Sequence, residues 1–301
     1  MVVMISYARS GGTLLNKILS SFSKLIVISE ISEIGGGGSD NALKTVNSQA
    51  KSWYGYDLSS DEFYKSIVEL NKYAEQDEKI LILRDWTYIN YPIYDEVPEQ
   101  YSEKLQVMQL DKHIKDIKYF TFTRNAIDVW ISMNCPDVKS FGEKYLKYIN
   151  SINKSKLKVF KYEDLVCNPE HTISDIANYI SIDMIYKDNF YNIENVHGDM
   201  QTKSRGGSLK SIERLPRKPI GILNMIRLMR CDAIKQANII MGYPVGYYDK
   251  ERESNVLYFV LLIIIESLKD ISKYLKYLIK GRPVVGAKID NVHLANVLRK
   301  N

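Results

Sequence analysis

The chain has 301 residues, of which 45% are hydrophobic and 26% charged, a composition typical of a globular protein with a full core. A net charge of +5 is mild for this length and argues against a nucleic-acid partner. The three cysteines are widely spaced and lack a CxxC motif or a nearby His pair, so we expect no disulfide framework and no metal site. The N-terminus lacks the pattern of a signal peptide, and we therefore expect a cytoplasmic protein.

Short apolar runs alternate with helical patterns over the first 180 residues. Strands are predicted at residues 2–6, 25–29, 79–83, 117–123 and 157–161. Helices are predicted directly after the first strand, at residues 61–73, after the fourth strand, and at about residues 171–180. Gly35 to Gly38 read as a flexible turn or loop. This alternation indicates an α/β fold, with a parallel sheet between two layers of helices.

Arginines follow three of these strands closely. Arg9, Arg84 and Arg124 come at or just beyond the predicted carboxyl ends, where parallel sheets bind their ligands. We therefore expect guanidinium groups to converge on one rim and to bind an anion. The basic stretch from Lys203 to Arg230, with eight Lys or Arg and one Glu, also favours a polyanion, although a solvated surface is the alternative.

The pattern changes beyond residue 244. Val256 to Ile265 is an unbroken apolar run, followed by apolar residues at helical spacing with lysines between them. Ten residues are too few to span a bilayer, which needs about 20. We predict one amphipathic helix in a C-terminal extension, residues 251–301, behind a main domain of residues 1–250. Packing on the core or a homodimer contact is favoured over attachment to a membrane surface.

The segment from Ser6 to Leu15 joins the first strand to the first helix. Gly11 and Gly12 would let backbone N–H groups approach an anion at the helix N-terminus, and Ser10 and Thr13 would add hydroxyl donors. Arg9 would supply a cation. The segment lacks the GxxxxGK[ST] pattern of a Walker loop. The alternative is a glycine turn whose Thr caps the helix.

This Arg-Ser-Gly-Gly-Thr loop resembles the 5′-phosphosulfate loop of the sulfotransferase superfamily, in the style of bacterial, carbohydrate and tyrosyl-protein sulfotransferases. The stretch from Phe120 to Ser132 resembles the second signature of that family, an Arg at a strand end and a Ser eight residues later that bind a 3′-phosphate. The resemblance implies a P-loop-like three-layer fold and the cosubstrate 3′-phosphoadenosine 5′-phosphosulfate (PAPS). The implied cosubstrate-binding residues are Arg9, Ser10, Gly11, Gly12, Thr13, Leu14, Arg124 and Ser132.

Two later segments resemble the family more loosely. Tyr-Glu-Asp-Leu at residues 162–165 is similar to a family segment, and we expect Glu163 and Asp164 to cap a turn there. Residues 196–207 are similar in placement to the mobile loop that closes over the nucleotide. Lys203, Ser204 and Arg205 are its candidate phosphate contacts, and His197 is either an acceptor-side group or simply exposed.

The resemblance also implies a catalytic base. In the tyrosyl-protein and carbohydrate branches a glutamate at the place of Glu30 removes the proton of the acceptor; Glu33 is a fallback, and Glu30 could instead neutralise the arginines. Other branches use a His after the third strand, but residues 83–87 contain none, which makes Asp85 the alternative base. With Arg9 stabilising charge, the implied reaction is in-line displacement at sulfur, and it requires no metal.

Two other functions remain open at this point. One is a P-loop kinase that uses ATP, against which the missing Walker Lys argues. The other is a non-catalytic protein with a degenerate fold, whose C-terminal helix serves assembly or a membrane surface. The 22 tyrosines and the aromatic stretch from Trp86 to Tyr91 would suit stacking on sugar rings, so a glycan or glycolipid is the expected acceptor.

Overall fold

The computed structural model describes residues 1–33, 35–36, 45–93, 99–190, 193, 212, 217–247 and 256–280. The chain divides into two compact units. The first contains residues 1–124 and 151–214, and the second contains residues 125–150 and 215–301. The predicted boundary at residue 250 stays a prediction.

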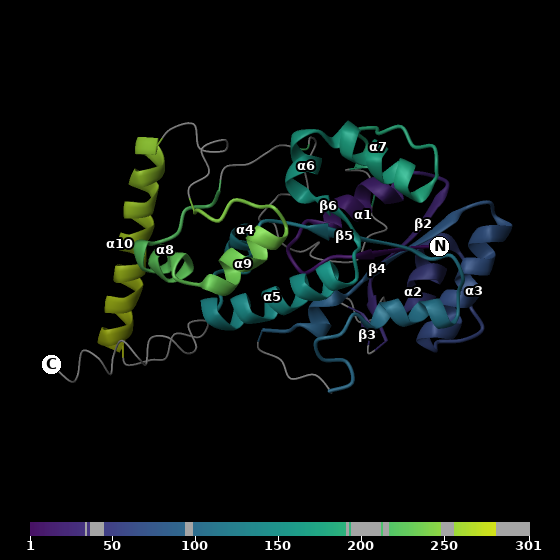
Figure 1. Ribbon diagram of the computed structural model, residues 1–301, viewed down its shortest axis with the longest axis horizontal. Helices are drawn as coiled ribbons and strands as arrows, with labels where there is room; N and C mark the ends of the chain where they lie inside the picture. Colours follow the sequence, from purple (N-terminus) through teal and green to yellow (C-terminus); the bar gives the residue numbers. More distant parts are fainter. Residues whose placement is uncertain are drawn as a thin grey trace. The chain divides into compact units, whose positions relative to one another are not determined.

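The first unit is built on a six-stranded sheet with the order β3-β2-β4-β1-β5-β6 (Figure 1). Five strands are parallel: β1 (Val2–Ile5), β2 (Leu25–Ser32), β4 (Ile80–Asp85), β5 (Lys118–Thr123) and β6 (Lys158–Lys161). The sixth, β3 (Gly35–Gly36), is antiparallel to β2. The prediction of an α/β fold with a parallel sheet is confirmed. The prediction of a turn or loop is wrong for Gly35 and Gly36, whose backbone pairs with Ser32 and Ile31.

The order of the strands identifies the edge at which a ligand would bind. The chain places β2 and β4 on one side of β1 and then crosses to β5 and β6 on the other side, so the order reverses at β1. Ile5, at the end of β1, is level with Asp85 of β4 and Thr121 of β5. In open parallel sheets the crevice beyond the carboxyl ends at such a reversal binds ligands.

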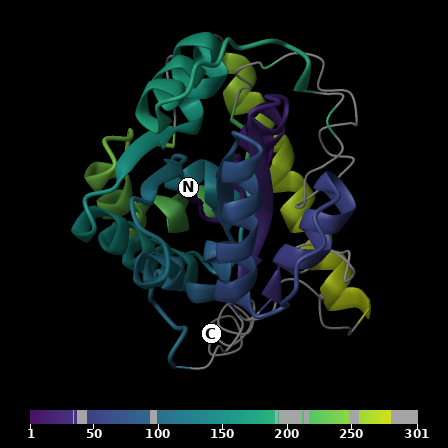
Figure 2. The ribbon, with the colours of Figure 1, turned by 90° about the vertical axis from the view of Figure 1, so that its right-hand side faces the viewer.

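Helices cover both faces of this sheet (Figure 2). One face packs against α1 (Gly12–Ser20), α6 (Tyr162–Cys167) and α7 (Pro169–Ile180) through a core cluster that includes Leu15, Phe120 and Ile173. The remaining helices are α2 (Val46–Gln49), the π-helix η2 (Ala50–Tyr54), α3 (Phe63–Gln76), and the 3₁₀ helices η3 (Thr87–Asn90) and η4 (Gln106–Lys112). The α6 segment was expected to be a turn; with Leu165 and Val166 buried, it forms a short helix instead.

The second unit is helical in the part that the structure describes. It contains α4 (Ala126–Ser132), most of α5 (Val138–Lys154), α8 (Ile222–Met229), α9 (Asp232–Ile240) and α10 (Val256–Lys280). Asn238 of α9 accepts a hydrogen bond from the N–H of Ala126 at 2.8 Å. The predicted C-terminal helix is confirmed as α10, and it contacts α8. Among the described helices, none is long and apolar enough to cross a membrane.

Candidate functional site

A tight loop leaves the end of β1 and opens α1. The N–H of Ser10 donates to the carbonyl of Tyr7 at 3.2 Å, which turns the chain. Gly11 then caps the helix with a φ of 89°, a left-handed conformation that glycine adopts at no steric cost. A Cβ on Gly11 would overlap the ring of Tyr162, so both the backbone angle and the packing require glycine here.

This loop has the properties of an anion site. The first N–H groups of a helix have no acceptor within the helix, and the helix dipole favours negative charge there. The first turn of α1 contains no acidic residue. The hydroxyl of Ser10 is fully buried and has no hydrogen-bond partner among the described residues. An anion bound in the loop could therefore accept hydrogen bonds from backbone N–H groups and from Ser10.

Arg124 lies against the same loop. Its Nη1 donates to the carbonyl of Arg9 at 3.2 Å, and its guanidinium carbon is 4.6 Å from the centre of the Tyr162 ring. Tyr162 therefore contacts both Gly11 and Arg124, and it is 7% exposed. The structure thus places the guanidinium of Arg124 beside the main chain of Arg9, so that two cationic residues belong to one rim.

Arg84 connects the loop to a carboxylate. This side chain is only 3% exposed, and its Nη2 binds Oε1 of Glu30 at 2.6 Å. Its Nη1 donates to Thr13 Oγ1 at 3.2 Å, and its Nε donates to Ser6 Oγ at 3.4 Å. A Cβ on Gly12 would come within 2.7 Å of Arg84 Nε, so the second glycine of the loop leaves room for this guanidinium.

The backbone around Glu30 is irregular. The pairing of β2 with β4 changes register between Ile28 and Ile31, and Glu30 has a φ of 51°. A bulge of this kind redirects a side chain, and a non-glycine residue in this region is strained. Arg9 also has a positive φ, 67°. Two of the three predicted catalytic residues therefore adopt conformations that are uncommon for their residue type.

Asp85, the alternative base, is buried beside Arg84. Its Oδ2 accepts a hydrogen bond from Thr87 Oγ1 at 2.7 Å. Burial raises the pKa of this carboxyl to about 7, against the opposing effects of the Thr87 hydroxyl and the charge of Arg84. A carboxyl with such a pKa could exchange a proton near neutral pH, but Asp85 is only 2% exposed.

The other predicted site residues are distributed as follows. The N–H of Leu14 bonds to the carbonyl of Gly11 at 3.0 Å, and the Leu14 side chain packs on the core cluster. Glu33 is exposed and accepts a hydrogen bond from Tyr64 at 3.1 Å. Ser132 is the last residue of α4, in the second unit, and its place at a phosphate stays a prediction. Four predicted residues lie outside the described ones: His197, Lys203, Ser204 and Arg205.

Comparisons with known proteins gave matches only among solved structures. No family model and no curated protein matches this chain. The sulfotransferase domain from the curacin biosynthetic pathway is 13% identical, with 81% of this chain and 98% of that chain covered, at a TM-score of 0.47. A sulfotransferase from Alicyclobacillus acidocaldarius is 10% identical (81% and 96% covered; TM-score 0.40). Mouse sulfotransferase SULT7A1, complexed with PAP, is 15% identical (69% and 64%; 0.33).

All three of these structures are sulfotransferases.

Two contributors to the site were not predicted as such from the sequence. Tyr162 was noted only as part of the Tyr-Glu-Asp-Leu segment, and Ser6 only as the start of the loop segment. Nothing in the spacing of residues 11, 124 and 162 indicates that they meet, because each belongs to a different element. Among the described residues, no group of three or more His, Cys, Asp or Glu could hold a metal ion.

Proposed function

We propose that this chain is a cytoplasmic sulfotransferase that moves the sulfuryl group of PAPS to an acceptor hydroxyl or amine. The observation that carries the proposal is the position of Arg84. Its guanidinium is bonded both to Thr13 of the anion-binding loop and to the carboxylate of Glu30. A group-transfer site needs a bound anionic donor and a proton acceptor close together, and this guanidinium joins the two.

The donor would be held by two parts of the rim. In this proposal the backbone of Gly11 and Gly12 and the hydroxyls of Ser10 and Thr13 bind the phosphosulfate, and Arg9 adds a positive charge. Arg124 binds the 3′-phosphate, and the sequence motif predicts Ser132 as a second contact. The contact of Arg124 with the carbonyl of Arg9 supports this division, because it brings the second guanidinium to the edge of the loop.

Glu30 would act as the general base. Only its Oε1 is bonded to Arg84, while Oε2 has no hydrogen-bond partner among the described residues. Oε2 takes the proton of the acceptor while the acceptor atom forms a bond to sulfur and the bond from sulfur to the 5′-phosphate oxygen breaks. Adenosine 3′,5′-bisphosphate leaves with the electron pair of that bond. Arg84 and the loop N–H groups stabilise the negative charge that develops.

A glycan or glycolipid remains the proposed acceptor, but only part of the aromatic stretch from Trp86 to Tyr91 is accessible for stacking on it. Tyr91 of the aromatic stretch is fully buried, and its hydroxyl bonds to Ser151 Oγ at 2.8 Å, so it belongs to the core. Trp86 and Tyr88 are half-buried and keep part of their surface accessible. These two are the residues of the stretch to test for stacking on a sugar.

The experiment first compares how two nucleotides change the melting temperature and then measures the transfer of labelled sulfate from PAPS. Adenosine 3′,5′-bisphosphate should raise the melting temperature of the full chain far more than ATP with Mg²⁺, because only the former carries a 3′-phosphate. Labelled PAPS is then offered with a panel of glycans and glycolipids, and Arg9→Ala should abolish the transfer of label. A larger shift with ATP would favour a kinase. A shift with the bisphosphate but no transfer to any acceptor would favour a non-catalytic protein.

A further inference from the structure

The helix α10 has an exposed apolar stripe. Six of its apolar residues are 38–60% exposed: Val260, Leu261, Ile264, Ile265, Leu268 and Ile271. At about 100° of rotation per residue, these six positions fall within an arc of about 140°. Contiguous apolar surface of this kind is uncommon on soluble monomers and marks an interaction surface.

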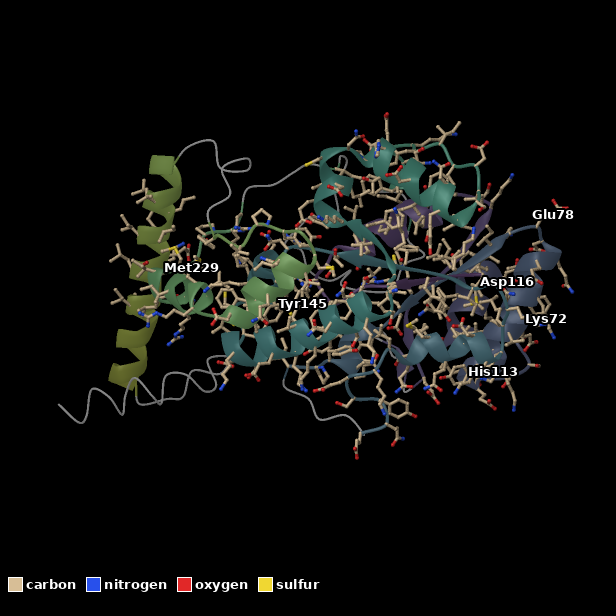
Figure 3. The ribbon with its side chains drawn as sticks, in the orientation of Figure 1. Lys72, Glu78, His113, Asp116, Tyr145 and Met229 are labelled. Atoms are coloured by element: carbon tan, nitrogen blue, oxygen red, sulfur yellow. The ribbon has the colours of Figure 1, made fainter. Side chains whose placement is uncertain are left out.

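The neighbouring helix α8 leaves this stripe uncovered and adds to the apolar surface. Its N–H at Ile222 donates to Ser267 Oγ at 3.0 Å, and a Cβ on Gly221 would lie 2.4 Å from Asp270 Oδ2. Ser267 and Asp270 are outside the arc of the stripe. The residues Ile222, Leu223, Ile226 and Met229 of α8 are themselves 41–55% exposed, and Figure 3 shows Met229 on α8 near α10.

Both helices carry an excess of positive charge. The sequence of α8 contains Arg227 and no acidic residue, and the exposed Arg230 follows it directly. The sequence of α10 has four lysines against two acidic residues. Lys269 lies beside the apolar arc and is 57% exposed in its pair with Glu266. Apolar helices bordered by Lys and Arg are typical of segments that lie in the plane of an anionic membrane surface.

We propose that α8 and α10 form a docking surface for an anionic phospholipid bilayer, with the apolar stripe in the interface and the basic residues at the headgroups. A homodimer is the other occupant to consider. In a two-fold symmetric dimer the same patch meets itself, so the excess positive charge of one copy would face that of the other. Anionic headgroups complement this charge, whereas a second copy repeats it.

The test measures sedimentation of the full chain with vesicles. We expect binding to vesicles of phosphatidylcholine with about one-third phosphatidylglycerol, much weaker binding to phosphatidylcholine alone, and weakening by salt. Leu268→Glu should lower the partition coefficient about 10-fold or more, because it places a charge in the stripe. Ile239→Glu, on α9, is the matched control at 66% exposure against 60% for Leu268, and it should leave binding unchanged.

Circular dichroism and melting curves establish that both variants are folded before binding is compared. The proposal is overturned if the chain does not sediment with the anionic vesicles, if it binds neutral vesicles equally well, or if the two variants lose binding equally. Sedimentation equilibrium without lipid tests whether a second copy of the chain binds this surface instead. A stable dimer that Leu268→Glu dissociates, together with no binding to vesicles, would assign the surface to a second copy instead.

Discussion

Among the residues that the structure describes, each unit has a buried arginine that forms an ion pair with a carboxylate, and the two arginines differ in their other hydrogen-bond partners. In the second unit Arg217 and Asp128 form a two-pronged contact, Nε to Oδ1 at 3.1 Å and Nη2 to Oδ2 at 3.0 Å. Nη1 donates to the carbonyls of Gly246 and Tyr247. In the first unit Arg84 reaches Glu30 through one nitrogen and uses the other two on the hydroxyls of Thr13 and Ser6.

The difference separates a structural pair from a candidate site. Arg217 is fully bonded to a carboxylate and to backbone carbonyls, which are fixed partners. Arg84 is bonded to hydroxyls of a loop that suits an anion, and Glu30 has a positive φ at a bulge. Such backbone strain costs about 1–3 kcal/mol and is concentrated at functional sites. A buried ion pair is therefore weak evidence of function until its remaining partners and its backbone are known.

The largest expected effect is on the structural pair. Arg217→Met should lower the free energy of unfolding by about 3–5 kcal/mol, because it removes the cation that forms an ion pair with the buried Asp128 carboxylate. Denaturation in urea measures this loss. The double variant Arg217→Met with Asp128→Leu should recover part of it, and Lys139→Met, at an exposed lysine, should change little. A loss no larger than that of Lys139→Met would contradict the structural role.

The matching change in the first unit should affect turnover more than stability. Glu30→Gln should lower sulfuryl transfer from labelled PAPS about 100-fold, because it removes the base. The amide oxygen can still accept from Arg84, but the buried guanidinium loses its counter-charge, so we expect the free energy of unfolding to fall by about 1–3 kcal/mol, less than in Arg217→Met. Glu33→Gln is the control, since Glu33 is exposed and bonds to Tyr64. Unchanged turnover in Glu30→Gln would leave Glu30 as a neutralising partner of Arg84.

The pH dependence of stability tests the buried carboxyl next to Arg84. Burial raises the pKa of Asp85 to about 7 from an ordinary 3.8, so the folded state keeps a proton that the unfolded state has released. Its contribution to stability is full below about pH 4 and is lost as the pH rises through about 7. Asp85→Asn avoids this loss. The free energy of unfolding of the variant, relative to that of the parent, should rise by on the order of 2 kcal/mol between about pH 5 and pH 8. The same difference between variant and parent at both pH values would contradict the raised pKa of Asp85.

The smallest expected effect concerns the aromatic ring beneath Arg124. Tyr162→Leu should weaken binding of adenosine 3′,5′-bisphosphate about 5-fold to 10-fold, because Arg124 loses the ring it lies over. Titration calorimetry measures the dissociation constant. Tyr162→Phe keeps the ring and should bind like the parent. Equal weakening in both variants would assign the effect to the hydroxyl and not to the stacking.

Much of the framework could be predicted from local sequence. The five parallel strands, α1 and α10 follow from the spacing of apolar residues, which is a property of each segment by itself. The loop after the first strand was predicted as an anion site from its glycines and hydroxyls for the same reason. The helices α5, α8 and α9 were not predicted, although α5 and α8 also have apolar residues at helical spacing. The burial of Tyr91 in the aromatic stretch depends on packing between distant segments, and no local pattern indicates it.

The sequence by itself therefore determined the five parallel strands of the sheet, the glycine loop at the start of α1 and the amphipathic character of α10. Only the tertiary structure decided which charged groups meet. The bulge that directs Glu30 to Arg84 arises where β2 pairs with β4, and the position of Tyr162 below Arg124 depends on α6 packing against the loop. These contacts join residues 38 to 151 positions apart, from Arg124–Tyr162 to Gly11–Tyr162, and no local pattern records them. They exist because strand register and side-chain packing are set by the whole core.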